Sequence, residues 1–170
     1  MDPLSFVFYT DNAARGVNYG LEAALRWQAA ERLSLAATLG LLRTRYEEYL
    51  FGARSLSGRD QAHAPRYDFS LSAIWHHPTG WFARADWSGK DSFYFDASND
   101  QRSRAYQLLN LRAGFEARHW SVSLWAHNVF DRRYAVRGFY FGDEPPDFPN
   151  KLYVRWGDPR QVGLTASYRL

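Results

Sequence analysis

Apolar and polar residues alternate with a period of two along most of the chain. In the C-terminal segment 162–170, the even-numbered residues are apolar and the odd-numbered ones are small or polar. This alternation is typical of a β-strand with one apolar and one polar face. The same test predicts strands over 19–27, 33–41, 67–75, 81–87, 108–116 and 120–127, and a partial strand over 4–9. We therefore expect an all-β chain of about eight strands, each close to the roughly 9–11 residues that a tilted strand needs to cross a bilayer.

The connections between these strands alternate in length. The short ones are 28–32, 77–80 and 118–119; the long ones are 47–62 and 135–158, with 96–102 intermediate. Short turns on one rim and long loops on the other are typical of an outer-membrane barrel. A soluble β-sandwich also alternates, so this asymmetry favours an antiparallel transmembrane β-barrel wall.

Large aromatic residues on the apolar parity lie near strand ends, and small aliphatic residues fill the strand middles. Tryptophan and tyrosine prefer the membrane–water boundary, because the ring is apolar while its N–H or O–H donates a hydrogen bond. A sandwich core would place its largest rings in mid-strand instead. We predict membrane-interface positions for the set that flanks the short turns and the C-terminus: Trp27, Trp75, Trp81, Trp120 and Tyr168.

The opposite parity carries charged residues, among them Arg84, Asp86, Arg112 and Glu116. Unpaired charges in a dry core cost several kcal/mol each, so this face fits a wide lumen that holds water or a polar plug. Asp86 and Glu116 could mimic a catalytic acid pair. With two arginines nearby, salt bridges are the better interpretation.

Composition narrows the function classes. The 170 residues are 46% apolar and 18% aromatic, which excludes a disordered chain. A mean hydropathy of −0.50 without long apolar runs excludes transmembrane helices. The absence of cysteine excludes a disulfide scaffold and a thiolate site. The net charge of +3 is spread along the chain without a basic stripe, so we expect no nucleic-acid partner.

Two segments near the C-terminus carry a family resemblance. Residues 128–134 read Asn-Val-Phe-Asp-Arg-Arg-Tyr, 157–164 read Gly-Asp-Pro-Arg-Gln-Val-Gly-Leu, and the chain ends in Tyr-Arg-Leu. This pattern resembles the C-terminal end of TonB-dependent outer-membrane receptors, with weaker similarities at 20–22 and 59–65. Leu170 departs from the family's usual terminal Phe. Within the pattern, we expect Asn128 and Asp131 to bond backbone groups where the loop begins.

The resemblance implies the cell outer membrane and a barrel of about 22 strands around an N-terminal plug. Residues 1–170 would be a C-terminal segment of that barrel, without a plug domain or signal peptide. The implied function is energy-coupled uptake of siderophores and other iron chelates, cobalamin or similar scarce solutes. The implied partners are the plug, TonB, outer-membrane lipid and lipopolysaccharide. The alternatives are a self-contained eight-stranded outer-membrane barrel with a structural or adhesive role, and a secreted carbohydrate-binding sandwich.

No enzyme motif is present: the chain lacks Gly-x-Ser-x-Gly, His-Glu-x-x-His and a phosphate loop, so we expect neither an enzyme nor a cofactor. His76, His77 and His119 lie at short turns, on the rim opposite His63, so we expect polar turn roles and no metal site.

We expect ligand contacts in the long loops, where exposed segments are carried on a rigid scaffold. The candidates are His63 and three aromatic residues of the loop 136–156 that suit an amphipathic chelate, Phe139, Phe141 and Trp156. The alternative is that these rings pack on one another to fold the loop. Separately, Arg43 and Arg45 continue the outward parity beyond the apolar stretch. There they either pair with lipopolysaccharide phosphates or extend into water.

Overall fold

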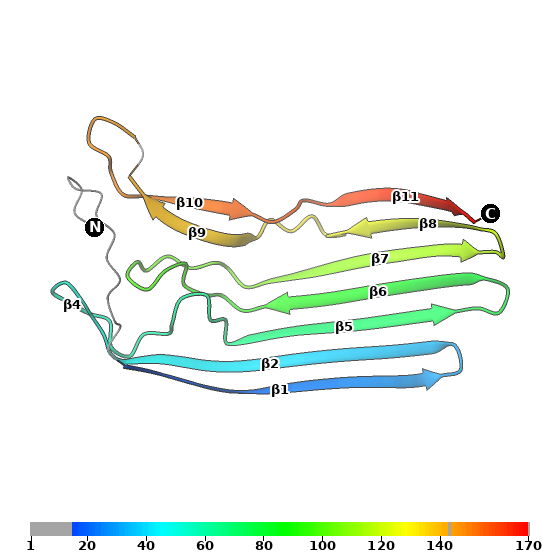
Figure 1. Cartoon of the computed structure of the whole chain (residues 1–170), viewed down its shortest axis with the longest axis horizontal. Helices are drawn as coiled ribbons and strands as arrows, with labels where there is room; N and C mark the ends of the chain where they lie inside the picture. The colour runs from blue at the N-terminus through cyan, green and yellow to red at the C-terminus, as the bar shows by residue number, and fades with distance from the viewer. Residues whose placement is uncertain (1–14, 143, 170) are drawn as a thin grey trace.

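A computed structural model describes residues 15–142 and 144–169, and within them the chain is built from β-strands alone (Figure 1). Seven strands form one sheet in which every neighbouring pair is antiparallel. In sheet order they are β1 (Arg15–Ala30), β2 (Leu33–Glu48), β5 (Tyr67–His76), β6 (Trp81–Lys90), β7 (Tyr106–Glu116), β8 (Trp120–His127) and β11 (Gln161–Tyr168).

Two hairpins lie outside this sheet. One pairs β3 (Leu50–Phe51) with β4 (Arg54–Ser55), and the other pairs β9 (Ala135–Phe141) with β10 (Lys151–Trp156). The short turns gather at one end of the sheet and the long connections at the other (Figure 1). Among the described residues the sheet is open, with β1 and β11 as its two edges.

The seven predicted strands that fall within the described residues are confirmed. The predicted strand over 4–9 lies outside the described residues. β1 and β2 run to 16 residues each, well past 19–27 and 33–41, because they stay paired where their outward positions turn from apolar to polar. The long connection predicted over 135–158 is present, and its two ends pair as the hairpin β9–β10, which the alternation did not predict.

No helix in the described part of the chain is long and apolar enough to cross a membrane.

The register places the apolar positions of the alternating pattern of all seven strands on one face of the sheet. Near the short turns, Phe115 packs between Trp81 and Trp120, with ring centroids 5.2 and 5.4 Å apart. Further along, Phe69 meets Trp87 edge to face at 5.2 Å. Large side chains on this face are open: Leu25 is 60% exposed. A continuous apolar surface of this extent requires an apolar surrounding, and in an outer-membrane barrel that surrounding is lipid.

The opposite face is a hydrogen-bonded polar surface. Arg84 donates to both oxygens of Asp86 at 2.7 and 2.8 Å, and the Ser72 hydroxyl donates to the same carboxylate at 2.7 Å. Arg112 donates to Ser123 at 3.1 Å. The predicted salt bridge of Asp86 is therefore confirmed.

The salt bridge predicted for Glu116 was wrong, because this residue forms no ion pair with any described residue. Glu116 lies opposite Ser121 beside the short turn. The guanidinium of Arg112 instead bonds Ser123 and lies 5.6 Å from the ring centroid of Phe82.

The predicted interface aromatics all lie near the short-turn end of the sheet, Trp27 one outward-facing row further in than Trp75. Trp75 pairs with Leu33, Trp81 with Phe115, and Tyr168 with Trp120. Trp27 faces Leu35 across β1 and β2. Their role at the membrane boundary stays a prediction.

We predict that Gly163→Val destabilises the sheet. A Cβ at Gly163 would lie 2.2 Å from the ring of Trp125, whose Nε1 donates to Thr165 at 3.2 Å. Overpacking of this kind costs roughly 1–3 kcal/mol. The unfolding midpoint in detergent, followed by heat-dependent gel mobility, should fall. Leu164→Val, on the open apolar face, is the control and should change little; equal midpoints for both variants would contradict the stacking of Trp125 on Gly163.

Candidate ligand-binding site at the long-loop rim

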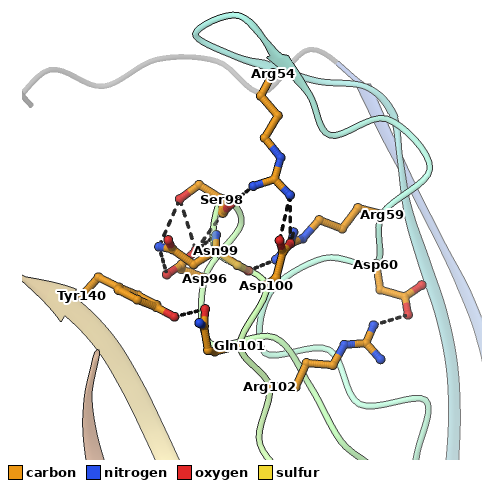
Figure 2. Close-up of polar contacts among 10 residues, drawn as sticks. All are labelled: Arg54, Arg59, Asp60, Asp96, Ser98, Asn99, Asp100, Gln101, Arg102 and Tyr140. Atoms are coloured by element: carbon orange, nitrogen blue, oxygen red, sulfur yellow. Dashed lines mark hydrogen bonds and ion pairs between the residues drawn. The ribbon is translucent and has the colours of Figure 1, made fainter. Parts of the chain in front are cut away.

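The long-loop end of the sheet holds a network of charged side chains, which we call the rim network: Arg54, Arg59, Asp60, Asp96, Asp100 and Arg102 (Figure 2). The ring of Tyr94 belongs to the same network. These residues come from two connections, 49–66 between β2 and β5 and 91–105 between β6 and β7. Because neighbouring strands end side by side, the two connections meet although about 40 residues separate them in sequence.

Asp100 joins the two connections. Its carboxylate accepts from Arg54 at 2.9 and 3.0 Å and from Arg59 at 2.6 Å. The Arg59 side chain is 8% exposed and also donates to the carbonyl of Asn99, while Arg54 donates to the carbonyl of Ser98 at 3.1 Å. The hydrogen bonds from Arg59 and then Arg54 hold the pKa of Asp100 below its ordinary value. The carboxylate is therefore charged at neutral pH and crosslinks the loops.

Tyr94 lies between two guanidinium groups. Those of Arg59 and Arg102 are each 3.8 Å from its ring centroid. Cation–π contacts on both faces of one ring hold it in place. Arg102 also lies 3.6 Å from Asp60, which accepts from Arg66 at 2.9 Å, so that the network continues to the start of β5.

Asp96 forms the turn that presents Asp100. Its carboxylate accepts from the backbone N–H groups of Ser98 and Asn99 at 2.8 and 2.6 Å, and from the Asn99 amide at 2.8 Å. Partial burial alone would raise the pKa of Asp96. The hydrogen bonds from Asn99 and Ser98 outweigh burial and lower it.

The hairpin β9–β10 packs on the 91–105 connection through a small apolar core of Phe93, Phe95, Ala135, Leu152 and Val154. Gly138 allows the close approach, since a Cβ there would lie 2.5 Å from the Phe95 ring.

The Tyr140 hydroxyl adds a polar tie, because it donates to Gln101 (Figure 2). Burial, with the nearby charges of Asp96 and Asp100, raises the pKa of Tyr140, so this hydroxyl keeps its proton at neutral pH.

A cavity of about 230 Å³ lies between the hairpin and the 91–105 connection. We call it the rim cavity; its lining includes Arg102, Arg104, Tyr106, Arg133 and Trp156. The guanidinium of Arg133 lies 4.3 Å from the ring centroid of Trp156, and Tyr106 packs on Tyr134 at 4.6 Å. Guanidinium donors beside flat aromatic surfaces can hold an anionic ligand that carries rings or chelating oxygens.

The predicted ligand-binding residues do not lie together. Trp156 lines the rim cavity, and the exposed His63 lies 5.5 Å from Phe93, ring to ring. Phe139 and Phe141 alternate with Gly138 and Tyr140, which face the 91–105 connection, so their rings point to the other side of the hairpin. There Phe139 stacks on Tyr153 with ring centroids 5.6 Å apart. This contact agrees with the alternative that the aromatic rings of the loop pack on one another. That these four residues contact a ligand stays a prediction.

The family-like motif fastens the hairpin to the sheet. Asn128 is buried at a positive φ of 47°; its amide donates to the carbonyls of Arg132 at 2.9 Å and Asp158 at 3.0 Å, and its oxygen accepts from the Arg132 N–H at 2.9 Å. Asp131, also at positive φ, accepts from the N–H of Arg160 at 2.8 Å. The backbone-bonding roles predicted for Asn128 and Asp131 are confirmed.

The histidines near the short turns have local contacts. Nδ1 of His77 bonds the Thr79 hydroxyl at 2.7 Å within the β5–β6 turn, the polar role predicted for it. His76 ends β5 beside the same turn, and His119 lies in the β7–β8 turn. Among residues 15–142 and 144–169, no group of three or more His, Asp or Glu side chains could hold a metal ion.

An antiparallel sheet with one apolar and one polar face, and with short turns opposite long loops, is the wall of an outer-membrane β-barrel. The protein-family model described as "TonB dependent receptor-like, beta-barrel" matches residues 2–129 of this chain. The chain belongs to this family, which consists of outer-membrane receptors rather than enzymes.

Solved structures extend the likeness to the rest of the chain. The ferric yersiniabactin uptake receptor FyuA from Yersinia pestis matches 91% of the chain with a TM-score of 0.74 at 22% identity. The siderophore receptor PiuA from Acinetobacter baumannii matches 89% with a TM-score of 0.72 at 14% identity, and the ferric citrate transporter FecA matches 90% with a TM-score of 0.67 at 15% identity. The chain spans 24%, 21% and 24% of these receptors, respectively.

We predict that the rim network loosens in acid. The folded pKa values of Asp96 and Asp100 lie below 3.8, so their stabilising contribution is complete above that pH and is lost as the pH falls through the lower folded values. Amide hydrogen exchange of 96–102, corrected for intrinsic rates, should accelerate below about pH 3.8. Asp100→Asn should show part of this acceleration at pH 7. Asp147→Asn, a control in the β9–β10 connection, should not; matching profiles for the two variants would contradict the role of Asp100.

Proposed function

We propose that the chain is a C-terminal part of the barrel wall of a receptor that imports ferric chelates, and that its rim cavity contributes to the ligand site. The observation that supports this proposal most directly is the position of the arginine- and aromatic-lined cavity, at the long-loop end of a TonB-dependent receptor barrel. The likeness to the barrels of a ferric yersiniabactin receptor and a ferric citrate transporter supports the same class of ligand.

The chemistry of the rim cavity favours an anionic chelate over an uncharged solute. Arg104 and Arg133 line it, and guanidinium groups pair with carboxylate or phenolate oxygens through two parallel hydrogen bonds. Trp156 offers a flat apolar surface beside them. His63, whose ring lies 5.5 Å from that of Phe93, would act as a further polar contact outside the cavity lining.

The sheet also favours a barrel wider than its own seven strands. Within the described residues, β1 and β11 are unpaired edges, and an edge in lipid leaves backbone groups without partners. Further strands would satisfy them and enclose a lumen wide enough for the charged inner face. In such a receptor the plug and TonB would couple energy to uptake, with the polar face of this wall turned toward the plug.

The proposal is tested by ligand binding to the receptor purified from outer membranes. Ferric catecholate and ferric citrate complexes are titrated against the wild type and Arg104→Ala/Trp156→Ala, with intrinsic fluorescence as the readout. A hydrogen bond to a charged group contributes about 1.5–3 kcal/mol, so the variant should bind roughly tenfold or more weakly.

Arg155→Ala/Phe139→Ala, on the opposite face of the hairpin, is the matched control. It should bind like the wild type if the ligand occupies the rim cavity. Unchanged affinity in Arg104→Ala/Trp156→Ala would contradict the proposal. A loss of affinity in the control variant alone would indicate that the ligand binds the Phe139 face of the hairpin instead.

A further inference from the structure

The face of the hairpin β9–β10 that points away from the rim cavity carries two opposed arginines. Arg137 on β9 lies directly opposite Arg155 on β10, and both residues are exposed. Like charges directly opposite each other destabilise a strand pair. Neither guanidinium group forms an ion pair with any residue in the described part of the chain. The described side chains therefore leave this repulsion uncompensated, and an external anion between the two guanidinium groups would remove it.

An aromatic pair occupies the next row of the same face. Phe139 lies opposite Tyr153, with ring centroids 5.6 Å apart and ring planes within 20° of each other. Phe139 is 50% exposed, so part of this aromatic surface is open to a ligand. The row after it pairs Phe141 with Lys151, whose ammonium group bonds Glu144. We call the three rows the outer strip: Arg137, Phe139, Phe141, Lys151, Tyr153 and Arg155. The outer strip itself contains no carboxylate.

The outer strip is supported from behind. On the opposite face of the hairpin, Leu152 and Val154 pack on the core of Phe93 and Phe95, and the Tyr140 hydroxyl bonds the 91–105 connection. An isolated hairpin is marginally stable in water, so this support holds the three rows in place before a ligand binds. A preformed surface loses less conformational freedom on binding.

The position and length of the outer strip restrict its ligand. The hairpin lies at the long-loop end of the sheet, opposite the short turns (Figure 1), and in an outer-membrane barrel the long-loop end faces the cell exterior. Residues two positions apart on a strand are about 7 Å apart, so the three rows span about 14 Å. A ligand that contacts all three rows is therefore a chain of linked units rather than a small ion.

We propose that the outer strip binds an acidic polysaccharide, with sugar carboxylates on Arg137 and Arg155 and a sugar ring against Phe139 and Tyr153. Guanidinium groups pair with carboxylates through two parallel hydrogen bonds. The C–H face of a sugar ring is apolar and packs on an aromatic side chain. An acidic peptide offers carboxylates without such rings, so it would use the arginine row alone. The outer strip and the rim cavity lie on opposite faces of the hairpin, so this proposal does not depend on chelate import.

The experiment uses the receptor purified from outer membranes in a mild detergent. Three probes are compared by calorimetric titration: oligogalacturonate, the same oligosaccharide with its carboxylates methyl-esterified, and polyglutamate of equal charge. The proteins are the wild type, an arginine variant, Arg137→Ala/Arg155→Ala, an aromatic variant, Phe139→Ala/Tyr153→Ala, and a lysine variant, Arg137→Lys/Arg155→Lys. The thermal unfolding midpoint of each protein without a probe reports whether it folds.

Arg118→Ala/Arg169→Ala is the matched control, because it removes two exposed arginines at the short-turn end. We expect oligogalacturonate to bind the wild type and this control equally. The arginine variant should bind it roughly tenfold or more weakly, since it loses hydrogen bonds between charged groups. The aromatic variant should also bind it more weakly, and the lysine variant should fall between the arginine variant and the wild type.

Three results would overturn the proposal. They are wild-type affinity for oligogalacturonate in the arginine or the aromatic variant, equal binding of the esterified and the acidic oligosaccharide by the wild type, and a loss in the control as large as that in the arginine variant. Binding of polyglutamate as tight as that of oligogalacturonate would assign the strip to an acidic peptide instead. If an alanine variant fails to fold, the comparison of the three probes on the wild type and the lysine variant still decides the question.

Discussion

Backbone pairing in an apolar surrounding is the constraint on which this structure depends. Inside a membrane every N–H and C=O must find a partner in the protein, so the seven main strands pair in sequence order with tight turns at one end. Pairing fixes the period-two alternation. The alternation separates a surface of Leu, Ala and Trp from one where Arg84 bonds Asp86 and Arg112 bonds Ser123.

The same strand pairing determines which loops lie side by side at the rim. Because β2, β5, β6 and β7 are neighbours, their long connections emerge side by side, and Asp100 can meet Arg54 and Arg59. The hairpin β9–β10 then rests on the same connection through Phe93 and Phe95, and the buried Asn128 fastens it at its base. A rigid wall thus carries a rim that is itself crosslinked, with an arginine- and aromatic-lined cavity between the hairpin and the 91–105 connection.

How much of this was predictable depends on the range of each interaction. The main strands follow from alternation, which is local, and the bonds of Asn128 and Asp131 follow from a motif. The partners of Asp100 lie more than 40 residues away in sequence, and only the fold brings them near. The two charge-rich connections, 54–60 and 96–104, were the available signal. β9 and β10 were not predicted, because aromatic residues occupy both faces of this hairpin and obscure the alternation of apolar and polar residues. A salt bridge was predicted for Glu116 because two arginines lie on the same face, but Arg112 bonds Ser123 on the neighbouring strand and Arg84 bonds Asp86.

The central claim is that one face of this sheet contacts lipid while the other faces the lumen. The most direct measurement is quenching by brominated lipids of receptor variants that keep a single tryptophan. Trp81 and Trp87 lie on the apolar face, and Trp125 lies on the polar face against Thr165. Fluorescence from positions 81 and 87 should be quenched strongly and that from position 125 weakly. Equal quenching at all three positions would contradict the assignment of the two faces.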